Sequence, residues 1–337
     1  MKELNNRLKS GRIDRAYIFS GPERYLIRAY EKRLRTAALG DMGDMNAAVF
    51  EGEKCHPDAI IAAAETLPFM SPKRLIIIKD SGLLQTGRKD ASDTLADYLP
   101  AMPETTVLLF IEYAKAPDKR VRLYKQILQK GLAVDFTTPS EGELITWLTK
   151  LCHAEGTEMT KGAALAMLRR IGMGGADGIM DILHAEAMKL AAYAGPGGTI
   201  ETSEVEALSQ QTAWGKVFDM VKELGQKNIK ALESFNALLA MKESPLMILS
   251  MMARQFRLIL ICAGLKAQGV AGAEIARRAG IRDFMAADFL RQSANFPQET
   301  LTAALSDCLE AEYGVKTGLI TDRLAVETLI IKYCTLL

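Results

Sequence analysis

The sequence has no excess of charge of either sign, and this balance limits the partners that it can attract. Its 337 residues include 42 lysines and arginines against 41 aspartates and glutamates, for a net charge of +1. Such a chain has no global basic field that would steer it to nucleic acid, so any contact with DNA has to come from a local patch.

Cysteine and histidine are scarce, and neither occurs in a pattern that would build a metal or catalytic site. The five cysteines are scattered, odd in number and without a CxxC pair: Cys55, Cys152, Cys262, Cys308 and Cys334. This pattern is typical of reduced thiols in a cytoplasmic protein. The three histidines accompany neither further metal ligands nor a GxSxG nucleophile motif. We therefore expect no metal, no cofactor and no catalytic residues.

Long apolar runs are also missing. The longest, residues 248–260, is interrupted by Arg254, Gln255 and Arg257, which makes it too polar for a membrane span. The first residues, MKELNNRLKSGRIDRAY, contain no apolar signal core. We expect a cytoplasmic protein without membrane contact, and the 49% of hydrophobic residues is enough for full-sized cores.

Short apolar runs alternate with helical patterns up to about Thr138. Five runs predict strands: Ala16–Ser20, Ala47–Phe50, Leu75–Lys79, Thr106–Ile111 and Leu132–Phe136. Four intervening segments predict helices: Glu23–Leu39, Pro57–Glu65, Ala91–Leu99 and Asp118–Lys130, the last ended by Gly131. Strands that alternate with helices favour a mostly parallel, three-layer α/β sheet.

The pattern becomes entirely helical after Thr138, and no convincing strand follows. The expected helices are Glu141–Ala154, Thr160–Ile171, Gly178–Ala194, Ser203–Gln210, Trp214–Leu224, Asn228–Met241, Pro245–Gln268, Ala273–Ala279, Asp283–Ala294, Pro297–Tyr313 and Asp322–Leu336. Thr160 and Ser203 are expected N-caps. The chain is thus predicted to contain a sheet domain (1–138), a small helical domain (139–210) and a larger helical domain (211–337).

The first strand is followed by a loop and a helix, the place where a nucleotide would bind in such a fold. A phosphate-binding loop needs glycines, a lysine and a Ser or Thr, as in GxxxxGK[ST]. Here the loop after Ser20 begins Gly21-Pro22-Glu23. Pro22 lacks a donor, Glu23 would repel phosphate, and no Lys-Ser/Thr pair follows. Glu112 and Asp80 are lone acids at the ends of two other strands, so the acidic set that holds Mg²⁺ is incomplete.

An apolar segment, Leu67-Pro68-Phe69-Met70, interrupts the regular pattern between the helix that ends at Glu65 and the strand that begins near Leu75. Pro68 and Pro72 exclude regular structure here. We call these four residues the apolar loop. Apolar loop residues more often fold back into their own core than face a partner, and the local pattern leaves both alternatives open.

Several segments resemble the delta-subunit family of bacterial DNA polymerase III, which are subunits of the sliding-clamp loader. In order along the chain they are YIFSGPERYLI (17–27), TLPFMSPKRLIIIK (66–79), YKQILQKGLAVDF (124–136), AWGKVFDMV (213–221), SPLMILSMMARQFRL (244–258) and YGVKTGLITDRL (313–324). The resemblance covers nearly the whole chain. The segments after residue 244 are the most specific, although none is a catalytic signature.

The resemblance implies an AAA+-like sheet domain with a degenerate nucleotide site, a helical lid domain and a C-terminal collar domain. It implies that the apolar loop, Leu67, Pro68, Phe69 and Met70, binds the sliding clamp (beta subunit) and opens the ring. Pro68 departs from family members with a larger aliphatic residue there, so Phe69 and Met70 would carry the contact.

The implied partners are ATP-binding subunits of the tau/gamma type, a delta-prime-type subunit and primed DNA, which would lie near Tyr313, Lys316 and Arg323. For Tyr313, an ordinary packed tyrosine at a helix end is the equal alternative. The other functions weighed are an active AAA+ ATPase, which the incomplete phosphate loop disfavours, and a helical adaptor outside replication.

Overall fold

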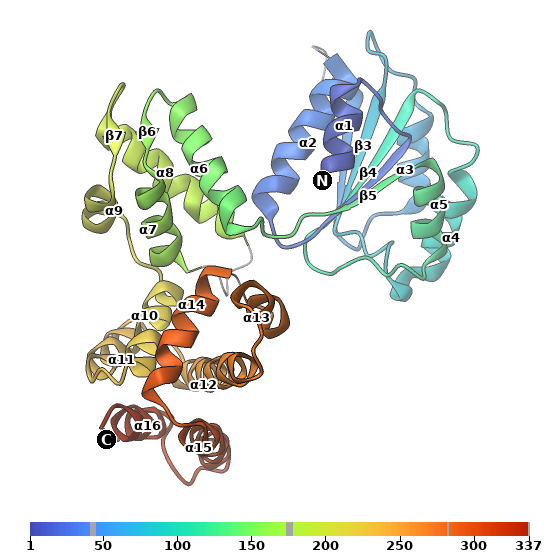
Figure 1. Ribbon diagram of the computed structural model, residues 1–337. Helices are drawn as coiled ribbons and strands as arrows, with labels where there is room; N and C mark the ends of the chain where they lie inside the picture. Colours follow the sequence, from blue (N-terminus) through green and yellow to red (C-terminus); the bar gives the residue numbers. More distant parts are fainter. Residues whose placement is uncertain (41–44, 173–177, 282, 336–337) are drawn as a thin grey trace. The chain divides into compact units, whose positions relative to one another are not determined.

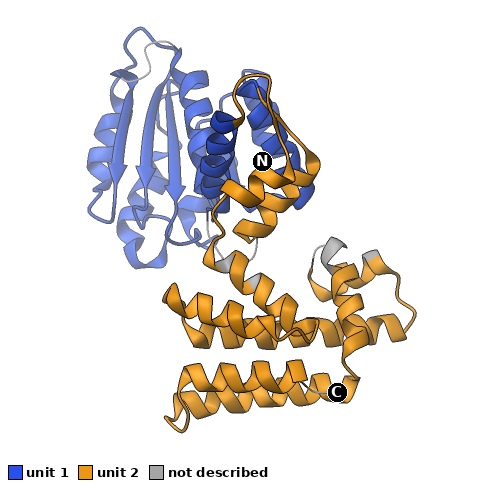
Figure 2. Ribbon diagram, turned by 90° about the vertical axis from the view of Figure 1, so that its left-hand side faces the viewer, with its two compact units in different colours: residues 1–156, 176–193 blue, residues 157–175, 194–337 orange. Residues whose placement is uncertain are grey.

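The computed structural model describes residues 1–40, 45–172, 178–281 and 283–335 (Figure 1). Its contacts divide the chain into two compact units, shown in different colours in Figure 2. Residues 1–156 and 176–193 form the first unit, and residues 157–175 and 194–337 form the second. The division into domains 1–138, 139–210 and 211–337 stays a prediction.

The first unit is built on a five-stranded parallel sheet with the strand order β2-β3-β4-β1-β5. Its strands are β1 (Ala16–Ser20), β2 (Ala47–Glu51), β3 (Arg74–Lys79), β4 (Thr106–Glu112) and β5 (Gly131–Asp135). The helices that connect them are α2 (Arg24–Leu39), α3 (Pro57–Glu65), α4 (Lys89–Tyr98) and α5 (Arg122–Lys130), with a short 3₁₀ turn, η2 (Thr86–Arg88), before α4. The predicted parallel α/β sheet is confirmed.

Alternate residues of the central strands face two separate cores. Phe19, Ile77 and Leu109 pack with α2 on one face, whereas Ile18 and Ile76 pack with α3, α4 and α5 on the other. Side chains that alternate across a strand explain why runs such as 75–78 are apolar at every position, since both faces are covered (Figure 1).

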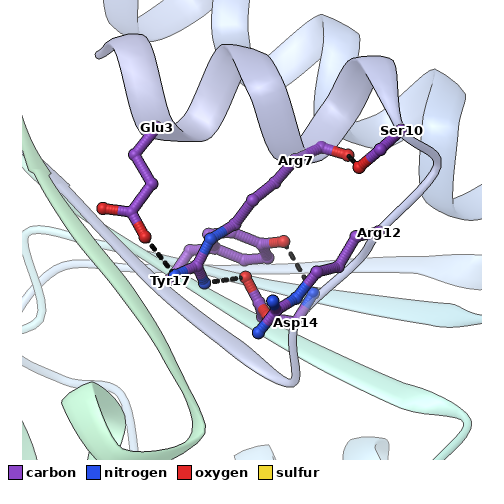
Figure 3. A network of polar contacts seen from close by, with 6 residues as sticks. All are labelled: Glu3, Arg7, Ser10, Arg12, Asp14 and Tyr17. Atoms are coloured by element: carbon purple, nitrogen blue, oxygen red, sulfur yellow. Dashed lines mark hydrogen bonds and ion pairs between the residues drawn. The ribbon is translucent and has the colours of Figure 1, made fainter.

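A helix that the sequence pattern did not indicate, α1 (Lys2–Lys9), covers the same face as α2. Its single fully buried side chain is Leu4. The helix is fastened through Arg7, which pairs with Glu3 and with Asp14 (Figure 3). The Asp14 N–H donates to the hydroxyl of Tyr17 at 2.7 Å, and burial raises the pKa of Tyr17 to about 12. The burial of Leu4 against the sheet forms only after the chain folds.

Two expected details of the helix before β5 need correction. The helix begins at Arg122 and not at Asp118, because residues 118–121 form a turn with a Val121 N–H to Asp118 carbonyl bond of 3.1 Å. It ends before Gly131, as expected, but Gly131 is extended and is the first residue of β5. A Cβ at Gly131 would lie 1.6 Å from the Ala16 carbonyl oxygen, so the close approach of β1 explains the glycine.

The first unit also holds α6 (Glu141–Ala154) and, up to residue 193, α8 (Ile179–Ala194). Ser140 begins α6 with a capping box, in which its Oγ accepts from the Glu143 N–H. The ring of Tyr25, on α2, lies 5.2 Å from the rings of both Trp147 on α6 and His184 on α8. Aromatic packing therefore ties both helices to α2.

Over its described residues, the second unit is helical apart from a two-residue parallel pair. Its helices are α7 (Lys161–Ile171), α9 (Thr202–Leu208), α10 (Ala213–Gly225), α11 (Lys230–Ala240), α12 (Pro245–Ala267), α13 (Gly272–Ala279), α14 (Asp283–Gln292), η3 (Ser293–Asn295), α15 (Gln298–Lys316) and α16 (Asp322–Thr335). The pair, β6 (Glu158–Met159) with β7 (Thr199–Ile200), corrects the expectation that no strand follows residue 138. Leu336, the expected end of the last helix, lies outside the described residues.

Local capping signals in this unit were predicted with mixed success. Thr160 caps α7 as expected, because its Oγ1 accepts from the Ala163 N–H at 3.2 Å. Ser203 does not cap α9. That helix begins at Thr202 with Glu201 as its N-cap, and the Glu204 side chain accepts from the Glu201 N–H at 3.0 Å. A glutamate in this capping position was not anticipated, because Ser is the commoner cap.

Helix α12 forms the centre of the second unit's core. Ile248, Met252, Phe256 and Ile259 are fully buried among α10, α11, α15 and α16. Among the described residues it is the one helix that is long and apolar enough, by length and composition alone, to cross a membrane. Packing in the core accounts for part of that composition, since 44% of this apolar window is buried.

Candidate functional site

The apolar loop lies on the surface of the first unit, between α3 and β3. The exposed fractions are 73% for Leu67, 56% for Phe69 and 77% for Met70, and Pro68 is half-buried. Monomeric proteins expose single apolar side chains commonly, but adjoining ones mark interaction sites. The alternative in which these side chains fill their own core is therefore not the one that the structure adopts.

Hydrogen bonds fix the segment that follows the apolar loop to the rest of the first unit. The Ser71 hydroxyl donates to the Leu39 carbonyl at 2.9 Å, and the Arg74 Nε donates to the Ala63 carbonyl at 2.8 Å. The Lys73 ammonium donates to the Glu104 carbonyl at 2.6 Å. Met70 has a φ of +49°, an uncommon backbone conformation for a residue other than glycine. The exposed side chains thus stand on an anchored backbone.

The apolar surface extends to a residue that sequence analysis missed. Met45 is 64% exposed and precedes β2, whereas the apolar loop precedes β3. Because β2 and β3 are parallel neighbours, both segments lie at the same end of the sheet, where these strands begin. A lone methionine before a strand carries no sequence signal, so only the topology could have identified Met45.

The loop that begins at Gly21, which lacks a complete phosphate-binding motif, follows β1 and therefore lies at the opposite end of the sheet, where the parallel strands finish. Gly21 has a φ of +120°, and a Cβ there would lie 2.6 Å from the Phe136 carbonyl oxygen. The Glu23 side chain is fully buried. Its carboxylate accepts from the Thr138 hydroxyl at 2.7 Å and from the Met180 N–H at 3.4 Å. The loop therefore packs against the end of β5 with a carboxylate inside it, which disfavours a bound phosphate.

The two acids at neighbouring strand ends also differ from a metal-binding pair. Asp80 Oδ1 accepts from the N–H groups of Tyr113 and Ala114 at 2.7 and 3.0 Å. Glu112 is 3% exposed, and its Oε1 has no hydrogen-bond partner among the described residues. Burial, together with the nearby charge of Asp80, raises the pKa of Glu112 to about 8. A largely protonated carboxyl at neutral pH is a poor ligand for Mg²⁺.

The predicted DNA-proximal residues lie in the second unit, around the turn between α15 and α16. Tyr313 is 64% exposed on the last turns of α15, so the packed alternative does not hold for its ring. Lys316 pairs with Glu312 at 2.5 Å, and Arg323 pairs with Glu327 at 2.8 Å. Their charges are partly neutralised, which leaves the exposed aromatic ring as the distinctive group.

Two family models for DNA polymerase III delta subunits match this chain, one in its N-terminal part and one in its C-terminal part. The family described as "DNA polymerase III, delta subunit" matches residues 17–137, and the one described as "DNA polymerase III delta subunit, C-terminal domain" matches residues 215–333. The DNA polymerase III subunit delta of Bacillus subtilis is 26% identical over 338 residues, which cover 96% of this chain and 94% of the relative.

A solved structure supports the same fold. The Bacillus subtilis DNA clamp loader delta protein superimposes with a TM-score of 0.57 at 24% identity, and the match covers 99% of each chain. The family matches include the segments that carry the apolar loop and Tyr313. The chain belongs to the family of bacterial DNA polymerase III delta subunits.

Proposed function

We propose that the chain binds a sliding clamp through the apolar loop and opens the ring, as a non-catalytic subunit of the clamp loader. The observation that carries the proposal is the exposure of Leu67, Phe69 and Met70 on an anchored backbone. Burying such a side chain fully contributes about 1.5–3 kcal/mol. Because the backbone is already fixed, little of this free energy is lost in ordering the loop.

The mechanism is driven by binding. A ligand shifts the equilibrium between a closed and an open ring only by its difference in affinity for the two forms. To open the ring, the apolar loop would have to bind a pocket of the clamp that is better formed, or easier for the loop to reach, in the open ring than in the closed ring. Each tenfold preference for that form shifts the equilibrium by about 1.4 kcal/mol.

ATP would act in the neighbouring subunits. The buried Glu23 carboxylate and the protonated Glu112 support a chain without nucleotide or metal of its own. The active-ATPase alternative would need both positions to rearrange. The partners are then ATP-binding tau/gamma-type subunits and a delta-prime-type subunit, joined through the collar helices of residues 211–337.

Primed DNA would contact the assembled loader near Tyr313, Lys316 and Arg323 in the cytoplasm. The exposed Tyr313 ring supports stacking on a base, which contributes roughly 1–3 kcal/mol. Ion pairs at Lys316 and Arg323 would have to exchange a carboxylate for a phosphate.

The proposal is tested by passing the purified sliding clamp over the immobilised full chain, without nucleotide and without other subunits. Retention of the clamp supports direct binding and separates the proposal from an adaptor outside replication. A folded chain that retains no clamp, even at concentrations of tens of micromolar, contradicts it.

A further inference from the structure

The backbone of the apolar loop is held from the side by one buried amide. Asn46 directly precedes β2, and its side chain is fully buried. Its Nδ2 donates to the Phe69 carbonyl at 2.8 Å, and its Oδ1 accepts from the Phe69 N–H at 2.6 Å. We propose that Asn46 is the positioning residue of the clamp-binding surface, which holds Phe69 in its binding conformation before the clamp arrives. This inference rests on the proposed function of the apolar loop.

The chemistry of the contact explains why an amide is needed. A backbone residue offers one donor and one acceptor, and a carboxamide is the small side chain that satisfies both from one planar group. The two bonds fix the peptide groups on both sides of the Phe69 Cα. Asn46 therefore gives Phe69 the two backbone hydrogen bonds that a paired strand would supply.

The contact also explains how the next residue keeps its unusual backbone. Met70 adopts a φ of +49°, a conformation that persists only when its surroundings impose it. Asn46 holds the residue before Met70, and the Ser71 hydroxyl, bonded to the carbonyls of Leu39 and Lys73, holds the residue after it. With both sides fixed, the Met70 side chain stays 77% exposed beside Phe69.

The expected effect on binding follows from the fraction of loops in the competent conformation. The apparent dissociation constant rises by the inverse of that fraction. If the loop without the Asn46 contact is competent about 3–20% of the time, the affinity for the clamp falls roughly 5- to 30-fold. The side chains that touch the clamp are unchanged, so the loss reports positioning alone.

The test uses the full chain with Asn46→Ala or Asn46→Asp, and measures clamp affinity by surface plasmon resonance from pH 5 to pH 8. Asn46→Ala removes both bonds and should bind weakly at every pH. Asn46→Asp keeps an acceptor for the Phe69 N–H but, as a carboxylate, has no donor for the carbonyl. Burial raises the pKa of such a carboxyl, so protonation towards pH 5 should restore the donor and most of the affinity.

A second readout needs no clamp. Compared at one pH, the Phe69 amide of the free chain should exchange slowly in the natural sequence and in Asn46→Asp, whose carboxyl still accepts from the Phe69 N–H, and fast in Asn46→Ala. A role confined to general stability would instead speed the exchange of amides throughout β2 and β3 together with that of Phe69. If Asn46→Ala fails to fold, the pH series of Asn46→Asp decides, and the absence of recovery at low pH overturns the inference.

The reference variant is Phe69→Ala with Met70→Ala. If this variant loses clamp binding while Asn46→Ala binds like the natural sequence, the positioning role is wrong and the clamp site stands. If the reference variant binds as well as the natural sequence, the proposed function is wrong, and the inference about Asn46 falls with it.

Discussion

Replacing Phe69 and Met70 together by alanine should abolish clamp binding and leave the fold intact. The two side chains are 56% and 77% exposed, so their truncation opens no cavity in either core of the sheet domain. The unfolding free energy should change by less than about 0.5 kcal/mol, as is usual for surface positions.

The loss of affinity follows from the area still available for burial. Full burial of each side chain contributes about 1.5–3 kcal/mol, and roughly half of Phe69 and three quarters of Met70 remain to be covered. The sum is about 2–4 kcal/mol, which corresponds to a roughly thirty-fold to thousand-fold weaker complex. Isothermal titration with the clamp measures this loss, and thermal unfolding measures the stability.

The matched control is Leu128→Ala. Leu128 is 46% exposed on α5, which packs beside β1 and β5, and β4 separates these two strands from β3. It should change neither clamp affinity nor melting temperature. A double variant with a much lower melting temperature and near-normal clamp affinity would contradict the exposure of these side chains and their role in binding. A buried Phe→Ala costs about 3–5 kcal/mol of stability, so the low melting temperature would show that the side chains are buried. The near-normal affinity would show that the clamp binds elsewhere.

Four further outcomes are expected. Calorimetric titration of the isolated chain with millimolar Mg-ATP should show no stoichiometric site, because Glu23 fills the loop after β1; a site in the sheet domain would contradict this. Glu112→Gln should stabilise the chain at alkaline pH. Between about pH 4.5 and pH 8 the folded state holds a proton that the unfolded state has released, so the unfolding free energy of the natural chain should fall with rising pH, by about 5 kcal/mol in total; denaturant titrations with equal pH slopes in both chains would disprove it. A fragment that begins at Gln211 should fold and co-elute with the partner subunits, because the core of α10–α16 lies within residues 217–333; a folded fragment that elutes alone counts against it. Tyr313→Ala should weaken binding of the assembled loader to primed DNA by about 5- to 100-fold, whereas Tyr193→Ala, a similarly exposed tyrosine, should not; equal effects in a fluorescence anisotropy titration would remove Tyr313 from the DNA site.

The sheet was predictable because its strands carry their own signal. The run 75–78 and the run 107–111 are buried on both faces and are therefore apolar at every position, a pattern that no surface strand shows. Helix α1 was not predictable in this way. Its one buried side chain, Leu4, packs on the face of the sheet that α2 also covers, and this contact requires the sheet to be in place.

Other features depend on contacts between residues far apart in the sequence. The pair β6–β7 joins Met159 to Ile200, and two residues are too few to produce a periodic pattern. The exposure of the apolar loop could not be decided locally, since an apolar loop that folds inward has the same composition. Asn46, 23 positions before Phe69, is an asparagine before a strand, and nothing in the surrounding residues marks it as a support for another loop.

Opening of the clamp by the apolar loop can be measured with a self-quenching fluorophore pair placed across a clamp interface, to which the chain is added without nucleotide. The natural chain should increase the fluorescence, and Phe69→Ala with Met70→Ala should not. Equal fluorescence with both chains, or an increase that depends on Mg-ATP added to the isolated chain, would contradict it.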